Sequence, residues 1–571
     1  MSASTSWSGF RPGFIAVIFG LILLGISGCK SLPELLDSYS EAAHELWGFN
    51  GVVAVVKGDR TLLLKGYGKA DTAFADPITP ETKFFIGSIT KQFTAALILK
   101  LYEQGRLDLS DPITKYLPDY PADPGDRITI HHLLLHTSGI PNYTENPEIV
   151  LRRTSVITPA EIIASFEHKP LEFEPGSQFK YSNSGYVLLG AIIEKVSGQS
   201  YEAFLHKEIL RPLEMHNTGY GRRVMGHPSR ARGYTVDESG RLIGAAPIRF
   251  SILHSAGALY STAEDLIKWD RALGEGTILS KKSLRLMLTP HSANYGYGWW
   301  LEKRYDRIHS FHGGFLDGFN STIDRWLEDT LLVLVLSNDD EAPVKKIARG
   351  LAAITLGKQP VIPALKEPIS LTPDELKDYV GIYRTEGGLE RFVVLEDDTL
   401  HTYLRGEPRY HIYSESLDHF FFAKDNTETM VFHRDHDHEV NSMVYSDGES
   451  KWAFKRVDSG SALLLMLNEP PLKLPVKALE EFMGDYLLDM DQTGATNPVA
   501  LSIDLCGGLL CASIDGNAPV TLWAKTASSF FHHASEFEIE FVRDDSGAVS
   551  GCVLTLSGSE VRGVLAPKTG R

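Results

Sequence analysis

Two groups of predicted β-strands enclose a long helical region, and this order constrains the fold more than any other feature of the chain. Residues 51–68, GVVAVVKGDRTLLLKGYG, are typical of two strands joined by a Gly-Asp turn. From about residue 84 to 288 the apolar spacing is helical, and residues 307–339 return to strands that we expect to be broken at Gly313 and Gly314. Strands at both ends predict an α+β domain, in which the two ends share one antiparallel sheet beside a helical insertion.

This domain, which we place at residues 40–357, is followed by a proline-rich linker and two similar β-rich segments. Four prolines fall within residues 358–373. Beyond them, DELKDYVGIY (374–383) resembles KALEEFMGDY (477–486), and short alternating segments separated by turns follow each copy. We therefore predict two antiparallel β-barrel or sandwich domains related by duplication, at residues 374–460 and 476–567.

The first 28 residues are typical of a lipoprotein signal peptide. Arg11 supplies one positive charge ahead of the apolar run FIAVIFGLILLG, which is too short for a comfortable membrane span. The run ends in Ile-Ser-Gly-Cys at residues 26–29, which resembles a bacterial lipobox with Cys29 as the lipidated residue. We expect export to the periplasm and a lipid anchor on Cys29, in the outer membrane because Lys30 is not an aspartate-type retention signal. A plain signal peptide or an uncleaved anchor are the alternatives.

Charge and cysteine content limit the possible partners. The formal net charge is −17, and a polyanion such as nucleic acid would be repelled by this chain. A small molecule or a short peptide is therefore the expected ligand, and contact with the membrane is expected through the lipid anchor only. Apart from Cys29 there are three cysteines, Cys506, Cys511 and Cys552, of which one pair could form a disulfide that the sequence does not identify.

The stretch FFIGSITK (84–91) contains a candidate nucleophile, Ser88, with Lys91 three residues later. Such a pair occurs by chance in a chain of this length, and Ser177 with Lys180 is a second case. Ser88 differs because it opens a strongly apolar helix that stops at Gly105, so Lys91 can project on the same side as the serine hydroxyl. The simpler alternative is that Ser88 or the following threonine only caps this helix.

Two further motifs contain residues suited to act with Ser88. Tyr181 and Asn183 precede a second helix, where a phenol near ionisation could accept a proton and an amide could donate to a substrate carbonyl. His312, Gly314 and Phe315 lie at a strand end, where the N–H of Phe315 could help to bind an oxyanion. Taken singly, each motif is equally compatible with a helix cap or a tight turn.

Together and in this order, SITK, YSN and HGG resemble the S-x-x-K, Y-x-N and K/H-x-G elements of the serine β-lactamase and penicillin-binding-protein superfamily, class C-like branch. ITIHHLLLHTSGIPNY (128–143) and YGYGWW (295–300) are further similarities, and the match extends over about residues 48–340. The resemblance implies a β-lactamase-like domain in which Ser88 attacks an acyl carbon. Lys91 and Tyr181 would share the acid and base roles, while Asn183, His312, Gly314 and Phe315 would bind the substrate.

The resemblance implies no metal and no cofactor. The stretch FHRDHDHE contains three histidines, but it lies in a polar turn of the first β-rich segment and we do not expect a metal site there. These histidines are His433, His436 and His438.

The chain departs from typical β-lactamases at His312, where those enzymes usually have a lysine that faces a substrate carboxylate. A mostly neutral imidazole favours esters, amides or peptides without a carboxylate at that end. Together with the duplicated C-terminal segments, this makes the chain most similar to D-stereospecific aminopeptidases. A family VIII-type esterase, a weak β-lactamase and a non-catalytic lipoprotein that binds cell-wall fragments are the alternatives.

Overall fold

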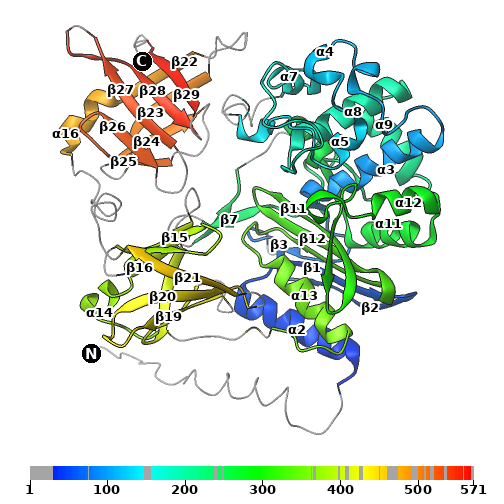
Figure 1. The fold of residues 1–571 in the computed structure, drawn as a ribbon, viewed down its shortest axis with the longest axis horizontal. Coiled ribbons are helices and arrows are strands. Elements are labelled where there is room, and N and C mark those ends of the chain that lie inside the picture. The colour runs from blue at the N-terminus through cyan, green and yellow to red at the C-terminus, as the bar shows by residue number, and fades with distance from the viewer. Residues whose placement is uncertain are drawn as a thin grey trace, which may run out of the picture.

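A six-stranded antiparallel sheet forms the centre of the first domain in the computed structural model (Figure 1). Its strand order is β10-β11-β12-β13-β1-β2, so the first and the last strands of the domain, β1 and β13, pair in the middle of the sheet. The predicted α+β fold, with one sheet shared by the two ends of the domain, is confirmed. The strands span β1 Gly51–Lys57, β2 Arg60–Tyr67, β10 Trp300–Arg304, β11 Arg307–Leu316, β12 Phe319–Trp326 and β13 Leu331–Ser337.

The structure describes residues 30–566 with short gaps, so the predicted signal peptide and Cys29 lie outside the described residues. Within the described part of the chain, no helix is both long and apolar enough to cross a membrane. The gaps are residues 75, 147–148, 150–155, 237–240, 247–249, 362, 364–367, 397–398, 405–409, 423–427, 449–450, 459–473, 490–498, 507–508, 515–519, 533–536, 545 and 557–558.

The strands of the sheet are apolar because both of its faces are covered. In β1, Val52 and Ala54 contact the core of the helical region, while Val53 and Val55 contact the opposite layer. Since successive strand residues point to opposite faces, a strand buried on both sides has no polar alternation. Two helices, α2 (Leu32–Trp47) and α13 (Val344–Thr355), form the second layer, and the helical insertion covers the first face (Figure 1).

The helical insertion is built around two buried helices, α3 (Thr90–Glu103) and α8 (Asn183–Ser197). Both end as predicted at a glycine in the left-handed conformation, Gly105 near α3 and Gly198 at α8. The remaining helices of the insertion are α4 Ala122–Gly125, α5 Ile130–Leu134, α7 Pro159–Ala164, α9 Tyr201–Leu205, α10 His254–Gly257, α11 Ala263–Glu275 and α12 Lys281–Met287. Its short strands are β5 Phe84–Phe85, β6 Gly219–Tyr220, β7 Tyr234–Val236, β8 Leu242–Gly244 and β9 Leu259–Ser261.

Strand β11 corrects one expectation from the sequence. It runs unbroken through Gly313 and Gly314, and the chain turns only after Leu316. The two glycines remain in the ladder because β12 pairs with both of them. Gly314 lets the backbone of Ile86 approach the strand, as described below, and neither glycine ends it.

Two closed eight-stranded barrels follow the first domain, in agreement with the predicted β-barrel or sandwich domains. Both begin with a short helix and carry the same contact: the hydroxyl of Tyr383 donates to the carbonyl of Tyr379, and that of Tyr486 to the carbonyl of Phe482, each at 2.8 Å. This repeated contact supports the duplication. The first barrel comprises α14 Pro373–Lys377 and β14 Gly381–Arg384 to β21 Lys451–Asp458, and the second α16 Val476–Leu479 and β22 Gly484–Asp489 to β29 Ser559–Leu565.

The structure also identifies the cysteine pair that the sequence left open. Cys506 and Cys511 form a disulfide across the β23 (Val499–Cys506) to β24 (Leu509–Ile514) hairpin. Cys552 is buried in the core of the second barrel as a free thiol, and burial raises the pKa of this thiol to about 12. It therefore acts as a small apolar side chain of the core.

A buried histidine links three strands near the edge of the sheet, β10, β11 and β12. In β11, His309 has no exposed surface, and its Nδ1 and Nε2 lie 3.1 Å from Glu302 and 2.8 Å from Asp324. Carboxylates accept hydrogen bonds, so both ring nitrogens must donate and the ring is a cation. These two carboxylates raise the pKa of His309 against the opposing effect of burial.

We expect this cation to make the thermal stability of the protein pH-dependent. Because the folded-state pKa is raised, its stabilisation is complete below the unfolded pKa of about 6.5 and is lost as the pH rises through the folded pKa. His309→Gln should destabilise by about 3 kcal/mol at pH 6, because it breaks a buried charged network. The gap in melting temperature between wild type and variant should narrow from pH 6 to pH 9, and a gap independent of pH would contradict a buried imidazolium.

Candidate active site

Ser88 lies directly before the buried helix α3. Gly87, Ser88 and Ile89 form a 3₁₀ turn that leads directly into α3, and Lys91 follows one turn later. Neither the turn nor the helix is capped by a side chain, so the capping alternative for Ser88 does not apply. The Ser88 Oγ lies instead 3.0 Å from the Lys91 Nζ, and Ser88 keeps part of its surface exposed for a substrate.

The surroundings of Lys91 favour its neutral amine. The side chain has no exposed surface, and its Nζ donates to the Asn183 Oδ1 at 2.8 Å and to the Ala256 carbonyl at 2.9 Å. These two contacts hold the Nζ in place beside the Ser88 hydroxyl. Burial lowers the pKa of Lys91 well below its usual 10.5. Lys91 is therefore positioned and tuned to take a proton from Ser88.

Tyr181 and Asn183 reach the same point from the start of α8. The Lys91 Nζ lies 4.9 Å from the centre of the Tyr181 ring. Burial raises the pKa of Tyr181, and interaction with the Ser88 hydroxyl offsets this only in part. Burial therefore favours the neutral phenol over the phenol near ionisation that the sequence suggested, and a neutral phenol can donate a proton. Asn183 holds Lys91 through its Oδ1, and its Nδ2 contacts Thr144 at 3.3 Å.

The backbone of β11 lies beside the 3₁₀ turn closely enough to form an oxyanion site. A Cβ atom on Gly87, whose φ is +49°, would lie 2.8 Å from the Phe315 nitrogen. A Cβ on Gly314 would lie 1.9 Å from the carbonyl oxygen of Ile86. Both positions therefore require glycine for the two segments to meet. The N–H groups of Ser88 and Phe315 flank this contact, as an oxyanion site for an acyl group on Ser88 requires.

His312 is buried beside these residues as a neutral imidazole. Its Nδ1 lies 2.6 Å from the Gly313 carbonyl and its Nε2 lies 3.0 Å from the Tyr295 hydroxyl. The first contact requires a proton on Nδ1, so Nε2 accepts from the tyrosine. Burial lowers the pKa of His312 to about 3. This agrees with the neutral ring expected from the sequence.

Two supporting residues were missed as site residues although their segments were noted. His136 is 2% exposed, and its ring lies 4.2 Å from that of Tyr181 and 4.8 Å from that of Tyr295. Tyr295 in turn contacts His312. The sequence signals are HHLLLHTSG and YGYGWW, but neither motif shows which side chain will contact Tyr181 or His312.

The competing Ser-Lys pair is not a site. The Ser177 hydroxyl donates to the Glu174 carbonyl at 2.6 Å on the surface, and the Lys180 Nζ binds Glu172 at 2.6 Å. The two side chains are therefore occupied by different partners. This favours Ser88 as the nucleophile.

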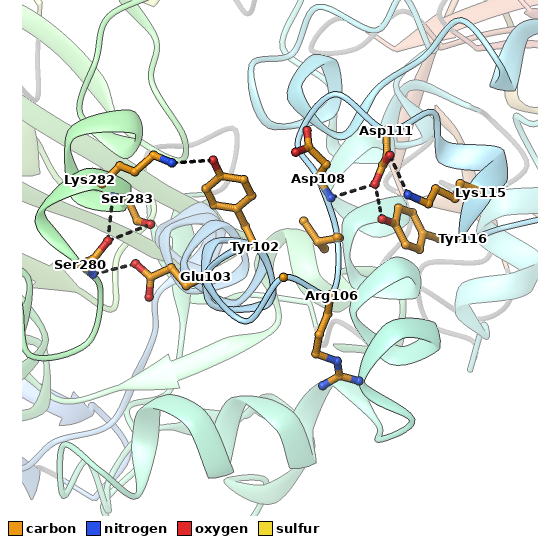
Figure 2. A pocket seen from close by; sticks show the side chains of 12 residues that line it. Tyr102, Glu103, Arg106, Asp108, Asp111, Lys115, Tyr116, Ser280, Lys282 and Ser283 are labelled. Carbon is orange, nitrogen blue, oxygen red and sulfur yellow. Dashed lines mark hydrogen bonds and ion pairs between the residues drawn. The ribbon is translucent and has the colours of Figure 1, made fainter.

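A cavity lies at the opposite end of α3 from Ser88. It has a volume of about 710 Å³, and its lining includes Tyr102, Lys282, Asp111 and Lys115 (Figure 2). A 14-residue helix is roughly 20 Å long, so this cavity is not the acyl site. Its charged groups bind one another, as in the Lys115–Asp111 pair at 2.9 Å.

In the histidine-rich turn, the side chains that come together are not the three histidines that stand out in the sequence. Among the described residues, Asp435, His436 and Asp437 have side-chain ligand atoms within 4.8 Å of one another, whereas His433 and His438 do not join them. The Asp435 Oδ1 accepts the backbone N–H groups of Asp437 and Glu439. The cluster is thus a hydrogen-bonded turn at the surface.

Comparison with known proteins is consistent with this geometry. A family model described as Beta-lactamase matches residues 41–356. The putative penicillin-binding protein PbpX of Bacillus subtilis (strain 168) is 34% identical over 292 residues, which is 51% of this chain and 71% of that protein. Penicillin-binding protein 4* of the same strain is 29% identical over 454 residues, 75% of this chain and 98% of its own. The structure of the octameric penicillin-binding protein homologue from Pyrococcus abyssi has 29% sequence identity and a TM-score of 0.55, and covers 74% of this chain and 99% of its own.

Proposed function

Because the chain belongs to the β-lactamase family, whose members are serine hydrolases, we propose that it hydrolyses small amides, peptides or esters through an acyl-Ser88 intermediate. The observation that carries this proposal is the fully buried Lys91, whose Nζ lies 3.0 Å from the Ser88 Oγ. A lysine with no exposed surface has a high desolvation cost, and a depressed pKa beside a nucleophile is the arrangement that base catalysis needs.

The first half of the reaction follows from these contacts. Neutral Lys91 takes the proton of the Ser88 hydroxyl as Oγ attacks the acyl carbon. The negative charge that develops on the acyl oxygen is bound by the N–H groups of Ser88 and Phe315, and each such donor contributes about 10²–10³-fold in well-studied enzymes. Asn183 keeps the Lys91 amine directed at Ser88 during this step.

The second half requires a proton for the leaving group and then a water. Tyr181 is neutral and lies beside Lys91, so its phenol can protonate the departing nitrogen or oxygen and recover the proton from the Lys91 ammonium. Water then attacks the acyl carbon, and the same groups act in reverse to release Ser88. Lys91 thus acts as the base of acylation, with Tyr181 as the proton donor.

We further propose that the preferred substrates resemble those of D-aminopeptidases. A neutral His312, hydrogen-bonded to Tyr295, gives no cation for a carboxylate next to the scissile bond. The two barrels that follow the catalytic domain are also similar to the architecture of D-stereospecific aminopeptidases. A family VIII-type esterase is the second candidate, because the same neutral site accepts an ester as readily as an amide.

One panel of substrates tests the proposal. Purified protein is assayed with the p-nitroanilides of D-Ala and L-Ala, with p-nitrophenyl butyrate and with nitrocefin. Preference for the D-Ala anilide supports the peptidase, preference for butyrate supports the esterase, and preference for nitrocefin contradicts both. A fluorescent phosphonate that fails to label Ser88 would favour the non-catalytic alternative.

His312 itself gives a sharper prediction about specificity. His312→Lys should raise kcat/KM for nitrocefin, relative to p-nitrophenyl butyrate, by about tenfold. Two opposite charges at ~4 Å attract by about 4 kcal/mol at an effective dielectric of 20, and desolvation removes most of this. The ratio is needed because the new lysine also acts on Lys91 and can slow all substrates alike. His312→Gln is the neutral control, and an unchanged ratio in the lysine variant would show that His312 does not discriminate carboxylates.

A further inference from the structure

The strand that carries the oxyanion donor has one free edge beside the nucleophile. Pairing between β10 and β11 ends at Trp300 and Phe311, so β10 covers no residue of β11 beyond that point. The 3₁₀ turn at Gly87 approaches this edge near Phe315. A substrate acylating Ser88 must therefore lie against the stretch of β11 from His312 to Phe315.

An exposed lysine lies against this stretch from the α13 side of the sheet. The Cε and Nζ of Lys345 would lie 3.4 and 4.0 Å from a Cβ atom placed on Gly313. The Lys345 side chain thus packs over the strand at Gly313, at van der Waals distance from the Cβ position. Lys345 is also close enough to His312 for its charge to contribute to the low pKa of that ring.

The two lysines in the first turn of α13 differ in their partners. The Nζ of Lys346 binds Glu428 of the first barrel at 3.1 Å. Lys345 has no ion pair or hydrogen bond among the residues that the structure describes, and the titratable side chain nearest to it on β11, His312, is neutral. An uncompensated positive charge therefore lies beside Gly313, on the α13 side of the β11 stretch that flanks Ser88.

Building on the proposed function, we infer that Lys345 binds a carboxylate of the substrate at the rim of the acyl site. The inner position, at His312, is neutral and buried, whereas the outer position is cationic and open to water. A substrate carboxylate next to the scissile bond would lie near neutral His312, whereas a carboxylate farther along the substrate would reach the Lys345 ammonium. Preferred substrates are therefore short peptides or amides with an acidic side chain near, but not at, the bond that is cleaved.

Matched peptide pairs test this assignment and locate the carboxylate. D-alanyl-D-glutamate α-amide is compared with D-alanyl-D-glutamine α-amide, and D-glutamyl-D-alaninamide with D-glutaminyl-D-alaninamide, so that the charge lies on the leaving group or on the acyl group. Lys345→Gln should lower the acidic-to-neutral ratio of kcat/KM in one pair by about fivefold, the size of an exposed ion pair. Lys345→Arg should retain the ratio, and 1 M NaCl should reduce it in the wild type.

Lys346→Gln is the matched control, since it removes the same charge one residue away and should leave both ratios unchanged. Equal ratios in wild type and Lys345→Gln, or the same loss in Lys346→Gln, would overturn the inference.

Binding separates this inference from the proposed function. In Ser88→Ala protein, N-acetyl-D-alanyl-D-glutamate α-amide and N-acetyl-D-glutamyl-D-alaninamide should each be titrated against the glutamine analogue. Adding Lys345→Gln should lower the affinity ratio of one pair about fivefold. If the wild type hydrolyses no peptide, the proposed peptidase activity fails, and these affinity ratios alone decide the role of Lys345: ratios unaffected by Lys345→Gln refute it.

Discussion

Ser88→Ala is expected to abolish phosphonate labelling and to lower kcat/KM for every substrate of the protein by at least about 10⁴-fold. The substitution removes the one atom that bonds to the acyl group, and in serine hydrolases the residual rate then comes from binding and the oxyanion site alone. Labelling followed by mass spectrometry and steady-state kinetics measure the two effects. Thermal unfolding should change little, because Ser88 is partly exposed and caps no helix.

Ser177→Ala is the control for this result. It removes a hydroxyl that donates only to the Glu174 carbonyl on the surface, so labelling and kinetics should remain at the wild-type level. Labelling that survives in Ser88→Ala and disappears in Ser177→Ala would show that the nucleophile is the wrong serine.

Lys91→Met is expected to lower kcat/KM by about 10³-fold, within the range of a removed general base. Methionine keeps the length of the buried side chain but has no lone pair of amine strength to take the Ser88 proton. In the wild type, kcat/KM should rise with pH through the pKa of Lys91 and stay constant above it. Because burial lowers this pKa, the rise should occur at a lower pH than for a free lysine. The variant should lose this rise, as a pH profile of kcat/KM would show.

Lys100→Met provides a comparison on the same helix. The Nζ of Lys100 donates to the Ile278 carbonyl, remote from Ser88, so this variant should keep both the rate and the pH profile. The Lys91→Met variant should fold. It leaves the Asn183 Oδ1 and the Ala256 carbonyl without a donor, at a cost of about 1–3 kcal/mol each, but it also removes the desolvation cost of the buried amine. A Lys91→Met protein that keeps its activity within tenfold would exclude lysine as the base.

Local chemistry made much of the site predictable. Ser88 and Lys91 lie three residues apart on a helix, and that spacing alone brings their side chains to one side. The stops at Gly105 and Gly198 follow from the low cost of the left-handed conformation for glycine. His312 was predicted to be neutral because the ordinary pKa of imidazole, about 6.5, lies below pH 7.

Long-range contacts explain the expectations that failed or stayed open. Gly313 and Gly314 were expected to break the strand, because the sequence does not show that β12 pairs with both residues. It also does not show that the Ile86 carbonyl lies where a Cβ atom of residue 314 would be. Tyr181 was expected near ionisation, but the surrounding aromatic rings bury it and raise its pKa. His136 and Tyr295 were missed because their partners are not sequence neighbours: His312 lies 17 residues from Tyr295, and the rings that contact His136 come from other segments.

Periodicity and turns, which are properties of neighbouring residues, predicted the order of domains and the α+β class. The resemblance of three short motifs to the β-lactamase superfamily added the β-lactamase-like fold and pointed to Ser88, Lys91, Tyr181 and His312 as candidate site residues. Only the tertiary structure decided how these side chains are tuned. The low pKa of Lys91 requires that segments near residues 183 and 256 close around it, and the uncompensated charge of Lys345 requires α13 to pack against Gly313. Desolvation and charge balance depend on every atom within a few ångströms, and those atoms come from parts of the chain that meet only after folding.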